Sequence, residues 1–303
     1  MVGYKGIWPV APTPFHLDGA VDYDGMDRVL DCMIDQGSDG ICILANFSEQ
    51  FLLTDEERRL LTERSLAHVA GRVPVVVTTS HFSTQIAVDR AAHAQAHGAA
   101  MVMMMPPYHG ALMRGTAEQT FEQFARVSEV GLPIMVQDAP LSGVDLPVPL
   151  LVRMAREIEM VKLFKIECPQ AATKLRILIE QGGDAIEGPF DGEEAITLMA
   201  DLDAGATGAM TSAMIPDQIK LVLTHYAAGN RSAAQAAYAR VLPAVNFENR
   251  QCGFRSAKVV MVEGGVIGSE FCRHPIPPLH PDTRDQLLEL VRPLLPIALN
   301  WGH

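Results

Sequence analysis

The stretch VKLFKIEC, residues 161–168, is typical of a buried strand, yet it carries an ammonium group and a carboxylate on one face. Side chains alternate along a strand, so Lys165 and Glu167 share a face with Val161 and Leu163. Burying a lysine there costs several kcal/mol, or the amine loses its proton, unless a partner compensates. A structural ion pair and a reactive amine both account for such a pair, so the rest of the chain has to decide.

Bulk composition indicates a globular chain with a large core. The 303 residues are 48% hydrophobic, which suits one barrel-type domain or two smaller domains. The net charge of −12 gives no basic surface for nucleic acid or for an anionic membrane. The first residues lack a signal peptide pattern, and no window of about 18 residues is continuously apolar. We therefore expect neither a nucleic-acid nor a membrane partner.

The five cysteines are scattered, odd in number and without CxxC or Cys/His metal spacing. This pattern favours reduced thiols in a cytoplasmic protein rather than a disulfide framework. No His, Asp or Glu pair with ligand spacing is joined by a third candidate at one strand end, so we expect no metal site.

Apolar runs recur every 20 to 35 residues or so, each followed by a helical pattern, which is the pitch of βα units in a parallel sheet. We expect eight strands, near residues 6–15, 39–46, 73–80, 99–107, 133–140, 161–168, 185–190 and 204–212. Eight units followed by a stop favour a closed (β/α)₈ TIM barrel over an open doubly wound sheet. The predicted barrel covers residues 1–228, and residues 229–303 form a C-terminal helical extension, with helices near 231–247, 250–264 and 283–299.

Local signals place several helix ends. Thr54 with Glu57, and Asp191 with Glu194, have the spacing of capping boxes that open helices. Gly37 suits the position just after the first helix, and Pro140 ends the fifth strand.

In such a barrel the reactive residues lie where the strands end, at the carboxyl side. The residues there are Thr13, Asn46, Phe47, Ser48, Glu49, Ser80, His81, Pro107, Tyr108, His109, Gln137, Asp138, Lys165, Glu167, Gly188, Thr211 and Ser212. Of the six lysines in the chain, only Lys165 is expected to point into the barrel mouth. A desolvated amine loses its proton more readily, and a neutral amine condenses with a ketone to form a Schiff base. These observations therefore favour a catalytic role for Lys165 over a purely structural ion pair.

These residues together resemble the dihydrodipicolinate synthase/N-acetylneuraminate lyase family over nearly the whole chain. The matching landmarks are residues 12–15, 18–19, 45–50 and 107–108, with Pro140 and Lys165. The resemblance implies a (β/α)₈ barrel with a C-terminal helical extension, commonly a homotetramer. It also implies a Schiff base between Lys165 and a 2-oxo acid, with no further cofactor.

Departures from the family pattern bear on the substrate. Gln137 stands where the family usually has a tyrosine that shuttles a proton in aldol chemistry, and glutamine cannot relay a proton. No arginine follows Pro140, which argues against dihydrodipicolinate synthesis. Asn46, Phe47 and Ser48 replace the Thr-Thr-Gly that binds the 2-oxo carboxylate, so backbone N–H groups are expected to serve, with Asn46 and Ser48 as side-chain donors.

The missing tyrosine, together with Glu167, resembles the branch of the family that dehydrates 2-keto-3-deoxy sugar acids in pentose breakdown. That likeness implies L-2-keto-3-deoxyarabonate as substrate and 2-oxoglutarate semialdehyde as product, in L-arabinose metabolism. Lys165 would form the iminium, Glu167 would move the C3 proton, and Gln137 would orient a hydroxyl or a water. The alternatives are an aldolase that releases pyruvate and a non-catalytic regulator that binds a 2-oxo acid.

The remaining candidates have structural explanations beside their functional ones. His81 can bind a substrate hydroxyl or merely hydrogen-bond in a loop. Tyr108 can contact substrate, or reach across a subunit interface as the family's tyrosine does, or simply pack at the rim. Gly188 and Ser212 are expected to line the substrate pocket.

Overall fold

The computed structural model describes residues 4–110, 112–139 and 142–302. The chain divides into two compact units. The first consists of residues 1–5, 74–193 and 197–210, and the second consists of residues 6–73, 194–196 and 211–303.

A row of parallel strands forms the centre of the first unit. In this row each strand pairs with the next, in the order β10 (Gly208–Ala209), β9 (Gly188–Asp191), β8 (Val161–Ile166), β7 (Ile134–Asp138), β4 (Met101–Met104) and β3 (Val75–Thr78). Nearly every residue in these strands is buried, so both faces of the sheet are covered. This burial explains why the strands are continuous apolar runs rather than alternating polar and apolar residues.

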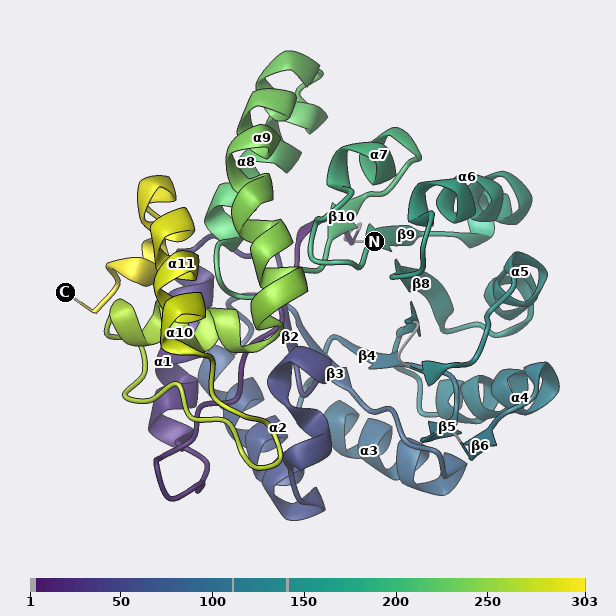
Figure 1. The fold of residues 1–303 in the computed structure, drawn as a ribbon. Helices are drawn as coiled ribbons and strands as arrows, with labels where there is room; N and C mark the ends of the chain where they lie inside the picture. The colour runs from purple at the N-terminus through teal and green to yellow at the C-terminus, as the bar shows by residue number, and fades with distance from the viewer. Residues whose placement is uncertain (1–3, 111, 140–141, 303) are drawn as a thin grey trace. The chain divides into compact units, whose positions relative to one another are not determined.

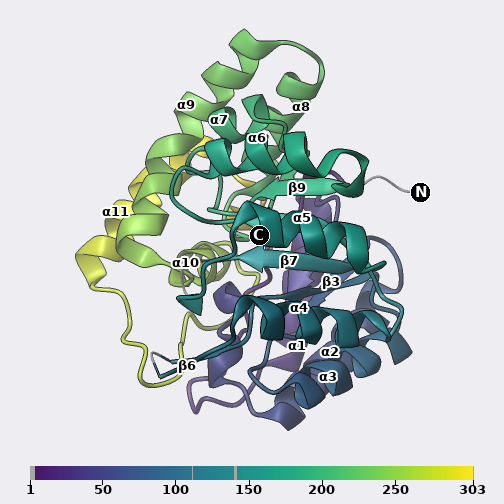
Figure 2. The same ribbon diagram turned by 90° about the vertical axis from the view of Figure 1, so that its right-hand side faces the viewer.

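Along the chain, one helix follows each of the strands β3, β4, β7, β8 and β9. The helices are α3 (Thr84–Ala96), α4 (Ala117–Ser128), α5 (Val148–Glu157), α6 (Ala171–Gly182) and α7 (Leu198–Asp203). Figure 1 shows them on the outer side of the strands, and Figure 2 shows α4, α5 and α6 lying along the sheet. The repeating strand–helix order confirms the βα units predicted from the sequence.

A short antiparallel hairpin follows β4 and was not predicted. It pairs β5 (Tyr108–His109) with β6 (Met113–Arg114), so that Tyr108 lies opposite Arg114. Two residues per strand are too few to show a period in the sequence.

The second unit carries strands β1 (Gly6–Ile7) and β2 (Ile41–Ile43), and single parallel bridges join Val10 to Cys42 and to Ser212. Its long helices are α1 (Tyr23–Asp35), α2 (Asp55–Val69), α8 (Pro216–Ala227), α9 (Arg231–Phe247), α10 (Arg255–Glu263) and α11 (Pro281–Val291). Helix α9 packs against α8 and α11, and α10 also packs against α11 (Figures 1 and 2). One turn of π-helix, η5 (Glu248–Cys252), joins α9 to α10.

Most predicted helix ends are confirmed. Thr54 and Glu57 form a reciprocal capping box at the start of α2, and Gly37 has a positive φ of 78° just after α1. The predicted boundary at residue 228 falls between α8 and α9. Among the described residues no helix is long and apolar enough to cross a membrane. Pro140, expected to end the fifth strand, lies outside the described residues.

Two predictions about helices are wrong. Asp191 and Glu194 do not form a capping box, because Asp191 is the last residue of β9 and the helix begins only at Leu198. Glu194 and Ala195 have positive φ angles of 50° and 70°, which a helix cannot contain. The predicted helix over 283–299 ends at Val291 and continues as two short 3₁₀ turns, η6 (Arg292–Leu294) and η7 (Ile297–Leu299). Prolines at 293 and 296 explain this break.

Candidate active site

Lys165 and Glu167 are in direct contact in the first unit. Lys165 lies on β8 with 3% of its surface exposed, and its Nζ atom makes an ion pair with Oε1 of Glu167. The backbone N–H of Glu167 donates to the carbonyl of Asp138 at 2.9 Å, so the chain beyond β8 stays in register with β7. The shared face predicted from strand parity therefore brings an amine and a carboxylate together.

Gln137 completes this group from the neighbouring strand. The register pairs Gln137 of β7 with Lys165 of β8. Nε2 of Gln137 donates to Oε1 of Glu167 at 2.9 Å, so one carboxylate oxygen accepts from both the amide and the amine. Gln137 thus holds the carboxylate that meets Lys165, and the three predicted catalytic residues form one hydrogen-bonded cluster.

Gly192 allows this cluster to form. A Cβ atom at Gly192 would lie 2.6 Å from Cγ of Glu167 and 2.7 Å from Cγ of Lys165, closer than real contacts allow. Gly188 was predicted to be the glycine at this strand end, and that placement is wrong. Gly188 is the first residue of β9 and pairs with Leu163, whereas the residue opposite Lys165 is Phe190.

His81 and Tyr108 follow β3 and β4. Nδ1 of His81 accepts the backbone N–H of Ser83 at 2.9 Å, so a neutral His81 carries its proton on Nε2. Tyr108 is partly buried, which raises the pKa of its phenol above the ordinary value and keeps it protonated. Both side chains are therefore suited to donate a hydrogen bond rather than to act as a base.

Asp138 was predicted to lie beside Gln137 at the strand end, but its side chain binds α6. Nζ of Lys174 lies 2.6 Å from Oδ2 of Asp138. Burial raises the pKa of the Asp138 carboxyl, while Lys174 opposes that shift. Adjacent strand residues face opposite sides, so Asp138 belongs to the packing between sheet and helix rather than to the cluster at Lys165.

In the second unit, Asn46–Ser48 form a single 3₁₀ turn, η1. Oγ of Ser48 donates to the carbonyl of Ala11 at 2.6 Å and accepts the N–H of Ala45 at 3.1 Å. Its one hydroxyl proton is used within the protein, so the expectation that Ser48 donates to a carboxylate does not fit the structure. Oδ1 of Asn46 accepts from Gln50 at 2.7 Å, which orients the Asn46 amide.

Phe47 sits in the middle of this turn and packs edge-on against Phe254, with ring centroids 6.3 Å apart. A 3₁₀ turn gives its second residue no acceptor within the turn, so the backbone N–H of Phe47 is a candidate donor to a ligand.

The residue after this turn is anchored by a buried ion pair that the sequence did not predict. Glu49 has a positive φ of 57°, and its carboxylate contacts Nζ of Lys258; both side chains are 0% exposed. Lys258 also donates to the carbonyl of Phe271 at 2.9 Å and lies 4.6 Å from the ring centroid of Phe15. The sequence places Lys258 on a helix. Nothing in the local sequence indicates that its partner lies 209 residues away.

Ser212, the last predicted substrate residue, lies in the loop before α8. It is buried, its Oγ accepts the N–H of Met214 at 3.2 Å, and its hydroxyl lies near enough to the carboxyl of Glu248 to lower the pKa of that group. The loop is thus tied to η5.

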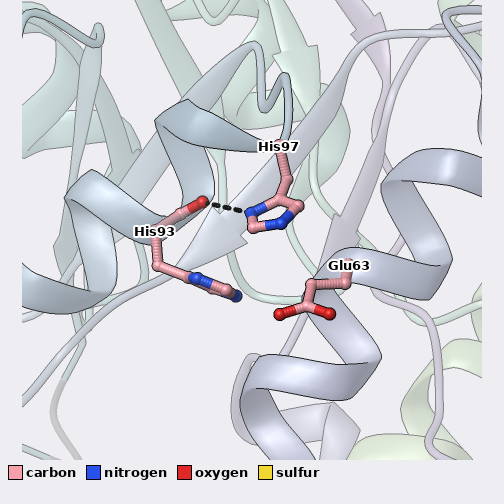
Figure 3. A group of neighbouring side chains, drawn as sticks. All are labelled: Glu63, His93 and His97. Carbon is pink, nitrogen blue, oxygen red and sulfur yellow. Dashed lines mark hydrogen bonds between the residues drawn. The ribbon is translucent and has the colours of Figure 1, made fainter.

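Two histidines stand together at the end of α3. The rings of His93 and His97 are 4.3 Å apart between centroids, and Nδ1 of His97 lies 2.8 Å from the carbonyl oxygen of His93 (Figure 3). Imidazoles at this end of a helix interact favourably with its dipole when protonated. The prediction that the protein holds no metal did not consider this pair, whose i, i+4 spacing occurs in metal-binding helices, and it stays a prediction.

Comparison with known proteins identifies the family. Residues 3–293 match the model of the "Dihydrodipicolinate synthetase family". The chain belongs to this family. A solved dihydrodipicolinate synthase from Aquifex aeolicus superimposes with a TM-score of 0.89 at 22% identity, covering 96% of this chain and 98% of that one. A structure from Pseudomonas aeruginosa gives a TM-score of 0.88 at 28% identity, over 96% and 99%. The predicted (β/α)₈ barrel with a C-terminal helical extension is confirmed.

Two relatives carry the names of enzymes. The chain is 60% identical to "L-2-keto-3-deoxyarabonate dehydratase" of Azospirillum brasilense, over 99% of this chain and 97% of that protein. It is 34% identical to "Probable 2-dehydro-3-deoxy-D-pentonate aldolase YjhH" of Escherichia coli over 52% of each chain. The prediction that the protein is an enzyme is confirmed, and the non-catalytic regulator is set aside.

Proposed function

We propose that this protein dehydrates a 2-keto-3-deoxy sugar acid through a Schiff base on Lys165. The substrate is L-2-keto-3-deoxyarabonate and the product is 2-oxoglutarate semialdehyde. The observation that carries the proposal is a buried lysine amine in contact with a carboxylate that Gln137 also binds. The 60% identity to a dehydratase of that name supports the substrate.

In the first half of the reaction Glu167 prepares the amine. It accepts a proton from the Lys165 ammonium, and the neutral amine attacks C2 of the 2-oxo acid. Glu167 returns its proton and the amine supplies a second, so the carbonyl oxygen leaves as water. The product is an iminium that acidifies the C3–H bond, and Glu167 is again a carboxylate.

In the second half, a base removes the C3 proton and the C4 hydroxyl leaves. The carboxylate of Glu167 is in contact with Lys165, so we assign it the proton transfer from C3. The electron pair of the C3–H bond enters the enamine, which expels the C4 hydroxyl as it takes up a proton. Loss of a proton from C5 and protonation at C3 and C4 then convert the C5 alcohol into the aldehyde. Water hydrolyses the iminium, which releases 2-oxoglutarate semialdehyde and returns the Lys165 amine. Gln137 cannot exchange protons, and its amide keeps the carboxylate oriented throughout.

Most of the residues predicted to bind substrate keep that role in the proposal. Those whose hydrogen bonds are used within the protein are given a structural role instead. The amide of Asn46 and the backbone N–H of Phe47 bind the 2-oxo carboxylate, while Ser48 stabilises the turn that carries them. His81, Tyr108 and Ser212 bind substrate oxygen atoms. Gly188 is not carried forward, since it begins its strand.

The alternative is an aldolase that cleaves the C3–C4 bond and releases pyruvate, and the relative named as a pentonate aldolase favours it. Gln137 argues against it, because aldol cleavage needs a group that moves a proton at the C4 hydroxyl and an amide cannot do so.

Product analysis distinguishes the two reactions. The protein is incubated with L-2-keto-3-deoxyarabonate, and the keto acids released are identified by mass. We expect 2-oxoglutarate semialdehyde; pyruvate with glycolaldehyde would establish the aldolase. Borohydride reduction in the presence of pyruvate should add mass at Lys165, and a Lys165→Ala variant serves as the control. An adduct on any other lysine would refute the assignment.

Further parts of the proposal follow from the family alone. They are a place in L-arabinose metabolism, a homotetrameric assembly, a cytoplasmic location, and chemistry without a cofactor beyond the Lys165 Schiff base. Size-exclusion chromatography with light scattering tests the assembly.

A further inference from the structure

A carboxyl group is buried in the second unit where α9 gives way to α10. Glu248 opens the π-helical turn η5 and has only 2% of its surface exposed. Two hydroxyl groups interact with its carboxyl: Ser256 of α10 is hydrogen-bonded to it, and Ser212, in the loop before α8, lies near enough to lower its pKa. Neither partner carries a charge, so nothing among them neutralises an ionised Glu248.

The hydrogen bonds of Ser256 indicate whether the Glu248 carboxyl is neutral or ionised. Oγ of Ser256 contacts Oε1 of Glu248 and also lies 3.0 Å from the carbonyl oxygen of Gly253. A hydroxyl has one proton, and a carbonyl oxygen has none to give. Both contacts are full hydrogen bonds only when Glu248 carries a proton and donates it to Ser256, which then donates to Gly253.

The neighbouring cations are engaged elsewhere. On α10, Arg255 donates to the carbonyls of Cys252 and Pro277, and Lys258 pairs with Glu49. On α11, Arg284 pairs with Glu263 and Glu270. The arginines of α9, at 231 and 240, and Arg250 of η5 are exposed. Within η5 itself, the Cys252 thiol has its pKa raised to about 11 by burial, so it stays neutral.

Burial favours the neutral form of the Glu248 carboxyl. It raises the pKa of Glu248 to about 7, although the hydrogen bonds from Ser212 and Ser256 favour the ionised form. An isolated buried carboxylate is costly, and a neutral acid that donates and accepts hydrogen bonds avoids this cost.

We propose that Glu248 works as a neutral carboxylic acid that positions Ser212 by linking it to Ser256 and the η5 turn. The positioning role rests on the proposed function, because Ser212 is one of its substrate-binding residues. The proton on Glu248 does not depend on that function. When Glu248 ionises, it draws the Ser256 proton away from Gly253, and the link between η5 and the Ser212 loop changes.

Infrared spectroscopy tests the proton directly and needs no substrate. We expect a carboxylic acid C=O band at pH 6 that disappears in Glu248→Gln and persists in Glu289→Gln, which changes an exposed carboxyl on α11. The band should titrate away with a midpoint near pH 7, the value to which burial raises the pKa of Glu248. Identical spectra of wild type and Glu248→Gln would overturn the inference.

Steady-state kinetics tests the positioning role. For the wild type we expect KM for the sugar acid to rise about 2- to 10-fold between pH 6 and pH 8.5, the worth of one hydrogen bond. The neutral amide of Glu248→Gln can replace both hydrogen bonds, so its KM should be flat over that range while kcat follows the wild type. A pH profile of KM that is the same in both proteins would overturn the role.

A second variant keeps the test open if Glu248→Gln fails to fold. Ser256→Ala removes the hydrogen bond that Ser256 makes with either form of the carboxyl. The bond to the ionised form is the stronger, so both the infrared midpoint and the break in KM should move to higher pH. An unmoved midpoint overturns the inference. If the protein turns over no sugar acid, the proposed function fails, and the infrared titration alone decides the state of Glu248.

Discussion

Nε2 of Gln137 lies 2.9 Å from Oε1 of Glu167, the same oxygen that contacts the Lys165 amine. One carboxylate oxygen therefore serves as acceptor for a group that can transfer a proton and for a group that cannot. This asymmetry separates the roles of the three residues, and each role predicts a different defect on substitution.

Replacing Glu167 by Gln should leave Schiff-base formation possible but slow the loss of water. General acid–base catalysis commonly contributes about 10²- to 10⁴-fold, so we expect kcat to fall by that factor. Borohydride trapping with pyruvate, followed to completion, measures the first step, and release of the semialdehyde measures the second. Dehydration at the wild-type rate would remove Glu167 from the mechanism.

Replacing Gln137 by Leu should lower kcat by a smaller factor, about 3- to 30-fold, because only the orientation of Glu167 is lost. The Gln137→Glu variant is the informative companion, since it places a second carboxylate beside Glu167 and should raise the pKa of the pair. The pH profile of kcat checks this. A shift to higher pH in Gln137→Glu alone is expected, and equal profiles in the two variants would contradict the contact.

Gly192→Ala should impair catalysis, because the added Cβ meets both Lys165 and Glu167. A displacement of about 1 Å in a catalytic group can cost about 100-fold, so we expect kcat to fall at least tenfold. Gly188→Ala is the matched control. Its Cβ would lie 2.4 Å from Cδ2 of Leu163, so it should destabilise the fold by about 1–3 kcal/mol and leave kcat of the folded fraction unchanged. Equal kcat losses in both variants would contradict this distinction.

Lys258→Met should destabilise the protein by about 3–5 kcal/mol, since it leaves the fully buried Glu49 carboxylate without its cation. The control is Lys220→Met, which breaks the partly exposed pair with Asp39 and should cost less than about 1 kcal/mol. Urea unfolding measures both. The double variant Lys258→Met/Glu49→Leu should recover part of the loss, and no recovery would argue against a charge effect.

Glu248 should make stability depend on pH. Its folded-state pKa of about 7 exceeds the ordinary value of 4.5, so the folded protein keeps a proton that the unfolded chain loses. This contribution is fully present below about pH 4.5 and is lost as pH rises to about 7, by about 3 kcal/mol in all. Urea unfolding of wild type and Glu248→Gln across that range measures it as the difference between the two curves. A constant difference would contradict the shift.

The sequence predicted those parts of the fold that local pattern controls. Alternation along residues 161–168 placed Lys165 and Glu167 on one face, and the Thr54/Glu57 spacing located the start of α2, because both depend on neighbours in the chain. The Asp191/Glu194 pair has the same spacing but failed, since β9 continues through Asp191 and the following residues have positive φ angles.

Other parts of the candidate site depend on partners far away in the chain. Strand register decides that Phe190, not Gly188, lies opposite Lys165, and a run of apolar residues does not reveal register. The hydroxyl of Ser48 binds Ala11, and the amine of Lys258 binds Glu49; each contact joins segments whose approach only tertiary structure determines.

The anchoring of the turn at Asn46–Ser48 also has a consequence for engineering. Its shape is set from outside, by the hydrogen bond from Thr13 to the Ser48 carbonyl and by the Glu49–Lys258 pair. The side chains at positions 46 and 47 can therefore be varied in a library to change which 2-oxo acid the protein prefers. The contacts of Ser48 and Glu49 keep the backbone of the turn in place in such variants.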